Sequence, residues 1–318
     1  MTHSRCLAGQ TDAPPLRSAQ RTYRPALWRL TVRQFRSSSW SPRLRSPALD
    51  RSRLRVKNSP LKTRVLERAG EPDARSGLRR ARRQQERCLS SHGPELFSLE
   101  GKLALVTGNG LIPHAIVTLF RNAGAQVVHA AEPALDEEAV ETVFSPLREL
   151  DILVNGSIRT GAWPIDRLEL DEWDRVHATN VRGAFLMMRE AARVMCGHGR
   201  GGRLITISTI GSVHPVLNGN YAYGSSRAGT NALVRQFALD FAASSITSNA
   251  ILVGAIRSDP FPPDCPMPPT GPGMDPRRLP LGYGTPEDVA PLALLLASEG
   301  GRYITGQSIA VDGGFLVA

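Results

Sequence analysis

Tyr223 and Arg227 are the two side chains whose types and spacing best suit proton chemistry. They stand four residues apart in the segment YGSSR, and on a helix that spacing places both side chains on one face. A phenol titrates near pH ~10, and a neighbouring cation favours the phenolate and lowers the phenol pKa. Such a tyrosine can exchange protons with a substrate, although the same pairing is more commonly a solvated surface pair.

Thr209 is placed near this pair by the segment that precedes the helix. The run RLITIS, which begins at Arg203, is apolar, β-branched and bounded by glycines, which indicates a strand covered on both faces. Ligands of open α/β sheets bind just beyond the carboxyl ends of the strands. Thr209 would lie there, where its hydroxyl could hold a substrate oxygen. The small residues that surround Arg227 leave room for a large flat ligand.

STIGS followed by YGSSR resembles the Ser, Tyr, Lys active site of the short-chain dehydrogenase/reductase family. The resemblance implies that Tyr223 is the acid/base. Thr209 stands in the place of the serine and keeps a hydroxyl, with a methyl group that restricts rotation. Arg227 stands in the place of the lysine, which in the family lowers the tyrosine pKa and binds the nicotinamide ribose. A planar guanidinium is not a conservative replacement for a compact ammonium.

The positive charge of the chain is concentrated in residues 1–95. This tail holds 20 arginines and 2 lysines against 7 acidic residues, a net charge of +15, whereas residues 96–318 hold 17 basic and 22 acidic residues, a net charge of −5. The tail is rich in Arg, Ser and Pro without sustained periodicity, so we expect it to be disordered.

Three explanations of the tail remain open: a transit peptide, a nucleic-acid-binding arm, or upstream sequence translated from an early start site. We favour the last, because arginine greatly outnumbers lysine and the tail is longer than most transit segments. Nucleic acid is an expected partner only if the tail is genuine and functional.

Residues 96–318 are predicted to form a single doubly wound, Rossmann-like α/β domain with a parallel sheet. GKLALVTGNG, from Gly101, indicates a strand, a glycine turn and a helix, whose N-terminus can meet a pyrophosphate. The turn resembles the family's TGxxxGxG motif with one residue fewer, and Leu111 and Pro113 stand near the positions of later glycines. The cofactor contacts expected in this turn are Thr107, Gly108, Gly110 and Ile112.

The cofactor is expected to be NAD or NADP, with a slight preference for NAD. GAQVVHAA indicates the second strand, and Glu132 follows it. A carboxylate at this place can accept the ribose hydroxyls, and no Arg or Lys is near in sequence to receive a 2′-phosphate.

The segment between Glu132 and Leu150 is too short for the family's third strand. Only 17 residues remain there, and DEEAVETVFSPLREL uses most of them as one amphipathic helix. A single parallel crossover needs a dozen or more residues. We therefore predict six parallel strands in the family order 2-1-4-5-6-7, near residues 103–107, 126–130, 151–155, 203–208, 247–252 and 308–311. The missing strand is an edge of the sheet, and one wall of the adenine pocket should go with it.

The second half of the domain resembles the family more closely. LDILVNGSI resembles the NNAG segment, which implies cofactor contacts at Asn155 and Gly156. Asn180, in NVRGAF, matches the asparagine that helps hold a water in the proton relay. A buried asparagine bonded to backbone is the alternative interpretation. Ser258 stands for the residue that contacts the carboxamide.

The C-terminal third supplies a lid and the closing elements. Residues 260–280 contain nine prolines, cannot form a continuous helix or central strand, and are assigned as a substrate-covering lid. PLGYGTPEDVAPLALLLAS and YITGQSIAVDGG match the family's closing helix and strand, with Thr285 as the helix N-cap.

These patterns predict an NAD(P)-dependent oxidoreductase that interconverts a small-molecule carbonyl and alcohol. Tyr223 would be the acid/base, Thr209 the oxygen anchor, Arg227 the electrostatic support and Asn180 the relay. A non-catalytic scaffold of the same family is the alternative, since the glycine turn, third strand, serine and lysine all depart from the pattern.

Assembly and location are also constrained by the sequence. In the family, the helix that Ala184 begins lies at a subunit interface, so a homo-oligomer, dimer or tetramer, is expected. The four cysteines are too far apart for a disulfide framework or a metal-ligand pair, which favours a reducing, cytoplasmic location without a metal. No apolar run is long enough to span a membrane.

Overall fold

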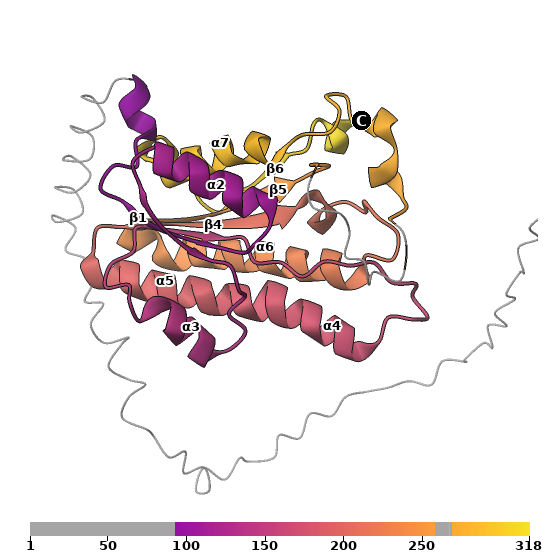
Figure 1. Ribbon diagram of the computed structural model, residues 1–318, viewed down its shortest axis with the longest axis horizontal. Coiled ribbons are helices and arrows are strands. Elements are labelled where there is room, and N and C mark those ends of the chain that lie inside the picture. The colour runs from indigo at the N-terminus through magenta and orange to yellow at the C-terminus, as the bar shows by residue number, and fades with distance from the viewer. Residues whose placement is uncertain (1–92, 258–266, 268) are drawn as a thin grey trace, which may run out of the picture. The chain divides into compact units, whose positions relative to one another are not determined.

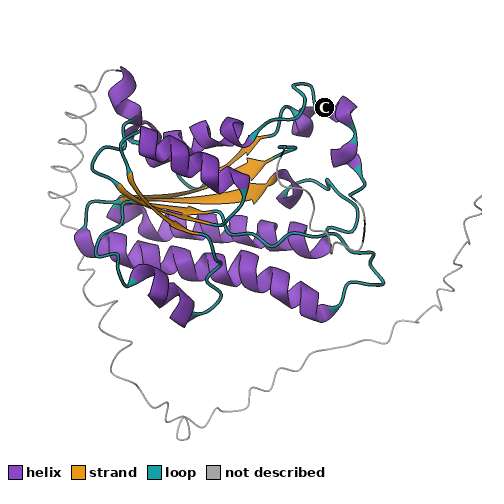
Figure 2. Ribbon diagram, viewed as in Figure 1, coloured by secondary structure: helices purple, strands orange, loops and turns teal. Residues whose placement is uncertain are grey.

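The computed structural model describes residues 93–257, 267 and 269–318. Its six strands form one parallel sheet in the order β2-β1-β3-β4-β5-β6 (Figure 2). In chain order they are β1 (Leu103–Thr107), β2 (Gln126–Ala130), β3 (Ile152–Asn155), β4 (Gly202–Thr209), β5 (Ile246–Val253) and β6 (Ser308–Val311). The predicted strands and their order are confirmed, and residues 131–151 contain no further strand. The tail predicted over residues 1–95 lies almost entirely outside the described residues.

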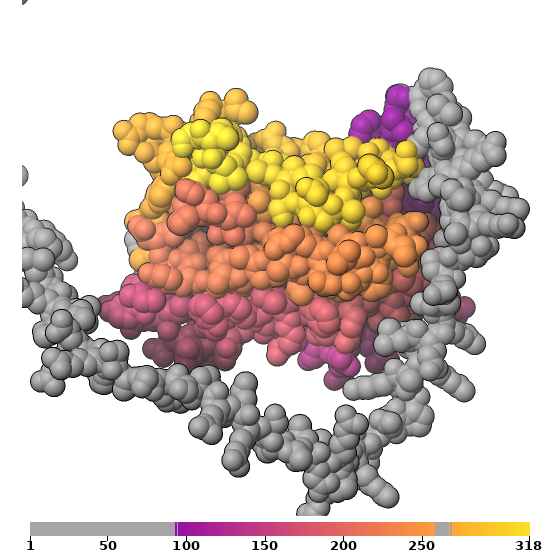
Figure 3. Space-filling model, turned by 180° about the vertical axis from the view of Figure 1, so that it is seen from behind, coloured from indigo at the N-terminus to yellow at the C-terminus, as the bar shows by residue number. Residues whose placement is uncertain are grey.

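Helices cover both faces of the sheet (Figure 1). On one face lie α2 (Leu111–Asn122) and α7 (Pro286–Ala297). The other face carries α3 (Glu137–Phe144), α4 (Leu170–His177), α5 (Ala184–His198) and α6 (Tyr221–Phe241). A π-helical turn, η2 (Ala178–Gly183), joins α4 to α5 as one continuous rod. Seen from behind, α6 and α5 form parallel bands below the C-terminal segment (Figure 3).

The core is divided into two apolar layers by the sheet. In β1, Leu105 belongs to the layer under α5 and α6, whereas Ala104 and Val106 belong to the layer under α2 and α7. Successive strand residues point to opposite faces, which explains this alternation. All four residues of β3 are buried, while the edge strands β2 and β6 are partly exposed. The central strands are therefore the rigid base on which the site is built.

The helix α3 occupies the segment of the chain between β2 and β3, where the family has its third strand, and it is shorter than predicted. Asp136 caps it by accepting a hydrogen bond from the Ala139 amide at 2.9 Å. The helix ends at Phe144, two residues before Pro146, because proline has no N–H with which to donate the next helical hydrogen bond, to the main-chain oxygen of Thr142. The predicted N-cap of α7 is confirmed, since the Thr285 amide donates to Asp288 Oδ2 at 2.7 Å.

The described part of the proline-rich segment, residues 267 and 269–280, contains two short 3₁₀ turns. No helix among the residues that the structure describes is both long and apolar enough to cross a membrane.

Candidate functional site

The glycine turn that leads from β1 to α2 packs closely against the chain that follows β3. Gly108 has a φ of +95°, and a Cβ there would lie 2.5 Å from Gly156 O, so the turn requires glycine. Thr107 Oγ1 accepts hydrogen bonds from the amides of Gly156 at 3.1 Å and Ser157 at 3.2 Å. The predicted residues Thr107, Gly108 and Gly156 therefore meet at the switch point of the sheet, where doubly wound folds bind ligands.

Two histidines that the sequence alone did not indicate hold the same turn. His129 Nε2 lies 2.6 Å from Gly108 O, and His114 Nδ1 lies 2.9 Å from Gly110 O. The two rings meet edge to face at 4.9 Å. A carbonyl oxygen can only accept, so each of these ring nitrogens carries a proton and donates. The shortened turn is thus tied to β2 and to α2 by imidazole bonds.

The helix α2 begins directly after Gly110, its N-cap. The first N–H groups of a helix have no partner within it, and here they belong to Leu111 and Ile112, because Pro113 has none. Leu111 is 45% exposed. The predicted contact of the Ile112 amide with a phosphate stays a prediction, and the turn supplies fewer donors than one with an unbroken run of amides.

Tyr223 and Arg227 lie on the first two turns of α6, as predicted. Arg227 is only 1% exposed, and neither its Nε nor its Nη2 has a hydrogen-bond partner among the described residues. A buried cation without a counter-charge is costly, because desolvation is not repaid. Two donors of the guanidinium next to Tyr223 are therefore unsatisfied within the described part of the chain.

Burial raises the pKa of Tyr223 above its ordinary value, while the charge of Arg227 and a hydrogen bond with Thr209 act in the opposite direction. The sequence predicted a lowered pKa. In the protein without ligand the desolvation of the phenol outweighs the nearby cation. The tyrosine is therefore a protonated, potential acid at neutral pH. Burial likewise lowers the pKa of Arg227.

Thr209 ends β4 and begins the loop that leads to Tyr223. Its Oγ1 accepts a hydrogen bond from the Gly211 amide at 3.1 Å, and its main-chain oxygen accepts one from Ser212 Oγ at 2.5 Å. Asn231, on α6, donates to Ser212 Oγ at 2.8 Å. These bonds fix the hydroxyl of Thr209 beside the helix that carries Tyr223.

Asn180 is wholly buried in the π-helical turn η2. Its side chain accepts from the Arg159 amide at 2.8 Å and donates to Arg159 O at 2.8 Å and to Ser226 Oγ at 2.9 Å. Ser226 Oγ donates in turn to Tyr223 O at 2.8 Å. The side chain therefore bonds backbone, as the alternative interpretation holds, and it also joins the loop after β3 to α6. Such π turns are frequent at functional sites, and the relay role stays a prediction.

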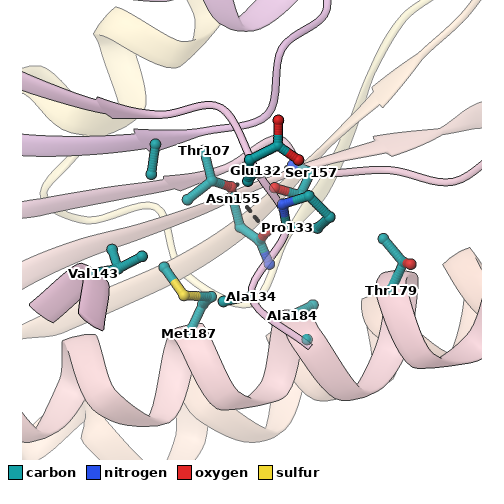
Figure 4. A pocket seen from close by; sticks show the side chains of 12 residues that line it. Thr107, Glu132, Pro133, Ala134, Val143, Asn155, Ser157, Thr179, Ala184 and Met187 are labelled. Atoms are coloured by element: carbon teal, nitrogen blue, oxygen red, sulfur yellow. Dashed lines mark hydrogen bonds between the residues drawn. The ribbon is translucent and has the colours of Figure 1, made fainter. Parts of the chain in front are cut away.

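A small cavity lies between the ends of β1 and β3 and the helix α5 (Figure 4). Asn155 Oδ1 accepts a hydrogen bond from Thr107 Oγ1 at 3.4 Å, while the buried Nδ2 of Asn155 has no partner within the described chain. Glu132 also lines the cavity, although this residue is exposed to solvent. The cavity measures about 10 Å³, which is room for about one water molecule.

The structure therefore places the predicted residues in two groups. Thr209, Tyr223, Arg227 and Asn180 converge on the start of α6, and the residues of the glycine turn, Glu132, Asn155 and Gly156 lie at the ends of β1, β2 and β3. Ser258 lies outside the described residues. Within the described ranges no group of His, Cys, Asp or Glu could hold a metal ion.

Helical spacing could have found Ser226, three residues after Tyr223. His129 acts on Gly108, 21 residues away, and Arg159 acts on Asn180, also 21 residues away. Contacts of this kind leave no periodic signal in a sequence.

Comparison with known proteins agrees with this architecture. The family model described as Enoyl-(Acyl carrier protein) reductase matches residues 121–316. The Escherichia coli (strain K12) protein named uncharacterized oxidoreductase YohF is 34% identical over 189 residues, which cover 57% of this chain and 70% of the relative. The 3-oxoacyl-(acyl-carrier-protein) reductase FabG of Rickettsia conorii is 32% identical over 254 residues, covering 70% of this chain and all of the relative.

Solved structures are similar over the same part of the chain. A short-chain type dehydrogenase/reductase from Mycobacterium marinum has a TM-score of 0.63 at 27% identity, with 70% of this chain and 99% of that chain covered. A Beutenbergia cavernae protein assigned as an NAD(P) dependent gluconate 5-dehydrogenase, with NADP bound at low occupancy, also has a TM-score of 0.63 at 27% identity, with 71% and 100% covered. The chain belongs to the short-chain dehydrogenase/reductase family.

Proposed function

We propose that this protein is an NAD(P)-dependent oxidoreductase that interconverts a carbonyl and an alcohol, with Tyr223 as the acid/base. The observation that carries the proposal is the fully buried Arg227, whose Nε and Nη2 have no partner among the described residues. It lies beside a tyrosine that also bonds Thr209. A buried cation next to a phenol is costly for folding and has no evident structural purpose. Strongly perturbed titratable pairs of this kind are concentrated at functional sites. The dehydrogenases and reductases among its relatives support the same class.

In reduction, the Tyr223 hydroxyl donates its proton to the carbonyl oxygen of the substrate. The bound NAD(P)H would supply the hydride that reaches the carbonyl carbon, so the product is an alcohol. Thr209 holds the reacting oxygen, and the charge of Arg227 stabilises the tyrosinate that remains. Oxidation runs the same steps in reverse, with the tyrosinate accepting the proton. Asn180 and Ser226 position the main chain of Tyr223.

The residues present fit such a cofactor at one end better than at the other. Arg227 has two buried donors without partners among the described residues, which suit ribose hydroxyls, and the amide of Ile112 at the start of α2 suits a phosphate. We propose a modest preference for NAD, because Glu132, at the end of β2, would meet a 2′-phosphate with a negative charge. The proposed carboxamide contact is Ser258.

A homo-oligomer, dimer or tetramer, in the cytoplasm is also proposed. The outer face of η2 and α5 carries a depression of about 920 Å³ whose lining includes the 37% exposed Phe185 and Leu233. Size-exclusion chromatography with light scattering measures the assembly, and a monomer at micromolar concentration would contradict it.

The proposed activity is tested by calorimetric titration with NADH and NADPH, followed by turnover of a panel of ketones and alcohols. We expect binding of at least one nucleotide and turnover that depends on Tyr223. The alternative, a non-catalytic scaffold, is favoured by the small cavity at the end of β1. It is accepted if neither nucleotide binds at millimolar concentration.

A further inference from the structure

We propose that this chain recognises its dinucleotide through the nicotinamide mononucleotide half and holds the adenosine half only weakly. The inference rests on the proposed function and names the part of the cofactor that the site binds. Its ligand class is thus a nicotinamide mononucleotide, alone or as part of NAD(P).

The chemistry decides which half lies where. The hydride must be transferred beside Tyr223, so the nicotinamide belongs near the carboxyl ends of β3 and β4 and the start of α6. A dinucleotide in a doubly wound fold crosses the switch point, and its two mononucleotides lie over the two groups of strands. The adenosine therefore belongs on the side of β1 and β2.

On that side the sheet ends at β2, and the chain that follows β2 turns inward. Ala134 is buried, and its main-chain oxygen lies so near Gly183 that a Cβ on that glycine would be 2.7 Å away. The next residue, Leu135, accepts a hydrogen bond from Arg182 Nε at 3.1 Å. The segment 132–135 is therefore packed against η2 and the start of α5, instead of leading to another strand.

This packing leaves little room for a base. The cavity between the segment 132–135, Asn155 and α5 measures about 10 Å³, whereas pockets for small ligands enclose roughly 300–1,000 Å³. The unpaired Nδ2 of Asn155 suits a single water there. A purine can enter this cavity only if the segment 132–135 leaves α5 and the Arg182 bond breaks.

The nicotinamide side is built in the opposite way. Its polar groups are side chains on central elements, and Arg227 keeps two buried donors without described partners. The donors of this guanidinium lose their contact with water when the protein folds. A ligand hydroxyl or phosphate oxygen that bonds them therefore adds a hydrogen bond without a further desolvation cost for these donors. Most of the binding free energy should therefore come from this half.

The test is calorimetric titration of the full chain with NADH, NADPH, reduced nicotinamide mononucleotide and ADP-ribose. We expect the mononucleotide to bind within about tenfold of NADH, and ADP-ribose to bind at least ~10-fold more weakly than the mononucleotide. NADH that binds more than ~100-fold tighter than the mononucleotide would overturn the inference while leaving the proposed function intact. If no nicotinamide compound binds, both proposals fall.

Two variants separate the halves. Arg227→Met should weaken NADH and the mononucleotide in parallel, by about tenfold or more, because both lose the same buried donor. Glu132→Ala probes the adenosine side and should change the Kd of NADH less than ~3-fold, while the matched control for Arg227→Met is Arg235→Met, on the exposed side of α6. A tenfold loss of NADH affinity in Glu132→Ala contradicts the proposal, and thermal unfolding of each variant reports whether it is folded.

Discussion

The two sides of the crevice differ in what supplies their polar groups. On the catalytic side Tyr223, Arg227 and Asn180 come from packed helices, and Asn180 forms three side-chain hydrogen bonds. On the β2 side the predicted ribose ligand, Glu132, is exposed, and the cavity that it helps to line measures about 10 Å³. The comparison teaches that a doubly wound sheet can lack an edge strand while the hydrogen bonds and packing that position the catalytic residues at its centre remain.

The physical reason lies in how the sheet is buried. β3 and β4 have neighbours on both edges and helices on both faces, whereas β2 pairs only with β1. Removing a strand beyond β2 exposes one edge and opens no hole in either apolar layer. Removing a central strand would separate the two halves of the core.

The largest expected effect is on the catalytic side. Tyr223→Phe should lower turnover about 10³-fold, because it removes the phenolic proton while keeping the ring. The Kd of NADH should stay within about twofold, since the ring still packs in place. Tyr221→Phe is the matched control, because Tyr221 lies on the same helix and is 49% exposed. Comparable activity in both variants would show that the phenol takes no part.

The next effect concerns the charge beside the phenol. Because burial raises the pKa of Tyr223, tyrosinate forms only at alkaline pH, so the rate of alcohol oxidation should rise with pH through and beyond the ordinary tyrosine range near pH ~10. Arg227→Met removes the opposing charge and should move this limb to still higher pH or abolish activity. Arg227→Lys should preserve or raise turnover.

The control for these variants is Arg235→Met, on the exposed side of α6. It should leave the pH profile unchanged. An unshifted profile in Arg227→Met would mean that the guanidinium does not act on the phenol.

A smaller effect is expected at the turn between the two halves. His129→Leu removes the donor to Gly108 O and should weaken NADH binding about tenfold, because the turn is no longer held for the phosphates. His129→Gln keeps an N–H near the position of Nε2 and should restore most of the affinity. His198→Leu breaks a bond of the same kind, from Nε2 to Leu150 O at 2.9 Å, at the opposite end of the sheet.

Calorimetry should give His198→Leu the same Kd for NADH as the wild type. If His129→Leu and His198→Leu lose affinity and melting temperature equally, the bond at the turn is merely structural.

The smallest effect should follow removal of residues 1–95. The sequence of this tail has no periodic apolar face that would pack on the domain, so the melting temperature should change by less than about 2 °C and the Kd of NADH by less than twofold. Differential scanning calorimetry measures the first, and a large drop would show that the tail contributes to the domain. If the tail serves nucleic acid, only the full chain should bind DNA, with steep dependence on salt.

Much of the fold followed from the sequence because its constraints are local or depend on length. The 17 residues between Glu132 and Leu150 cannot contain two crossovers, and the structure has one helix there. Other correct predictions likewise depend on residues that are close together in the sequence. They are the six strands, the helical spacing of Tyr223 and Arg227, and the N-cap of α7 at Thr285. The early end of α3 was missed, although Pro146 marks it.

Only the tertiary structure decided the state of the site. Desolvation raises the pKa of Tyr223, and the sequence could indicate the cation but not the burial that outweighs it. The bonds from His129 to Gly108 and from Asn180 to Arg159, and the packing of Ala134 on Gly183, join residues far apart in the chain. Such contacts depend on which surfaces meet when the layers pack, and spacing along a chain does not specify that.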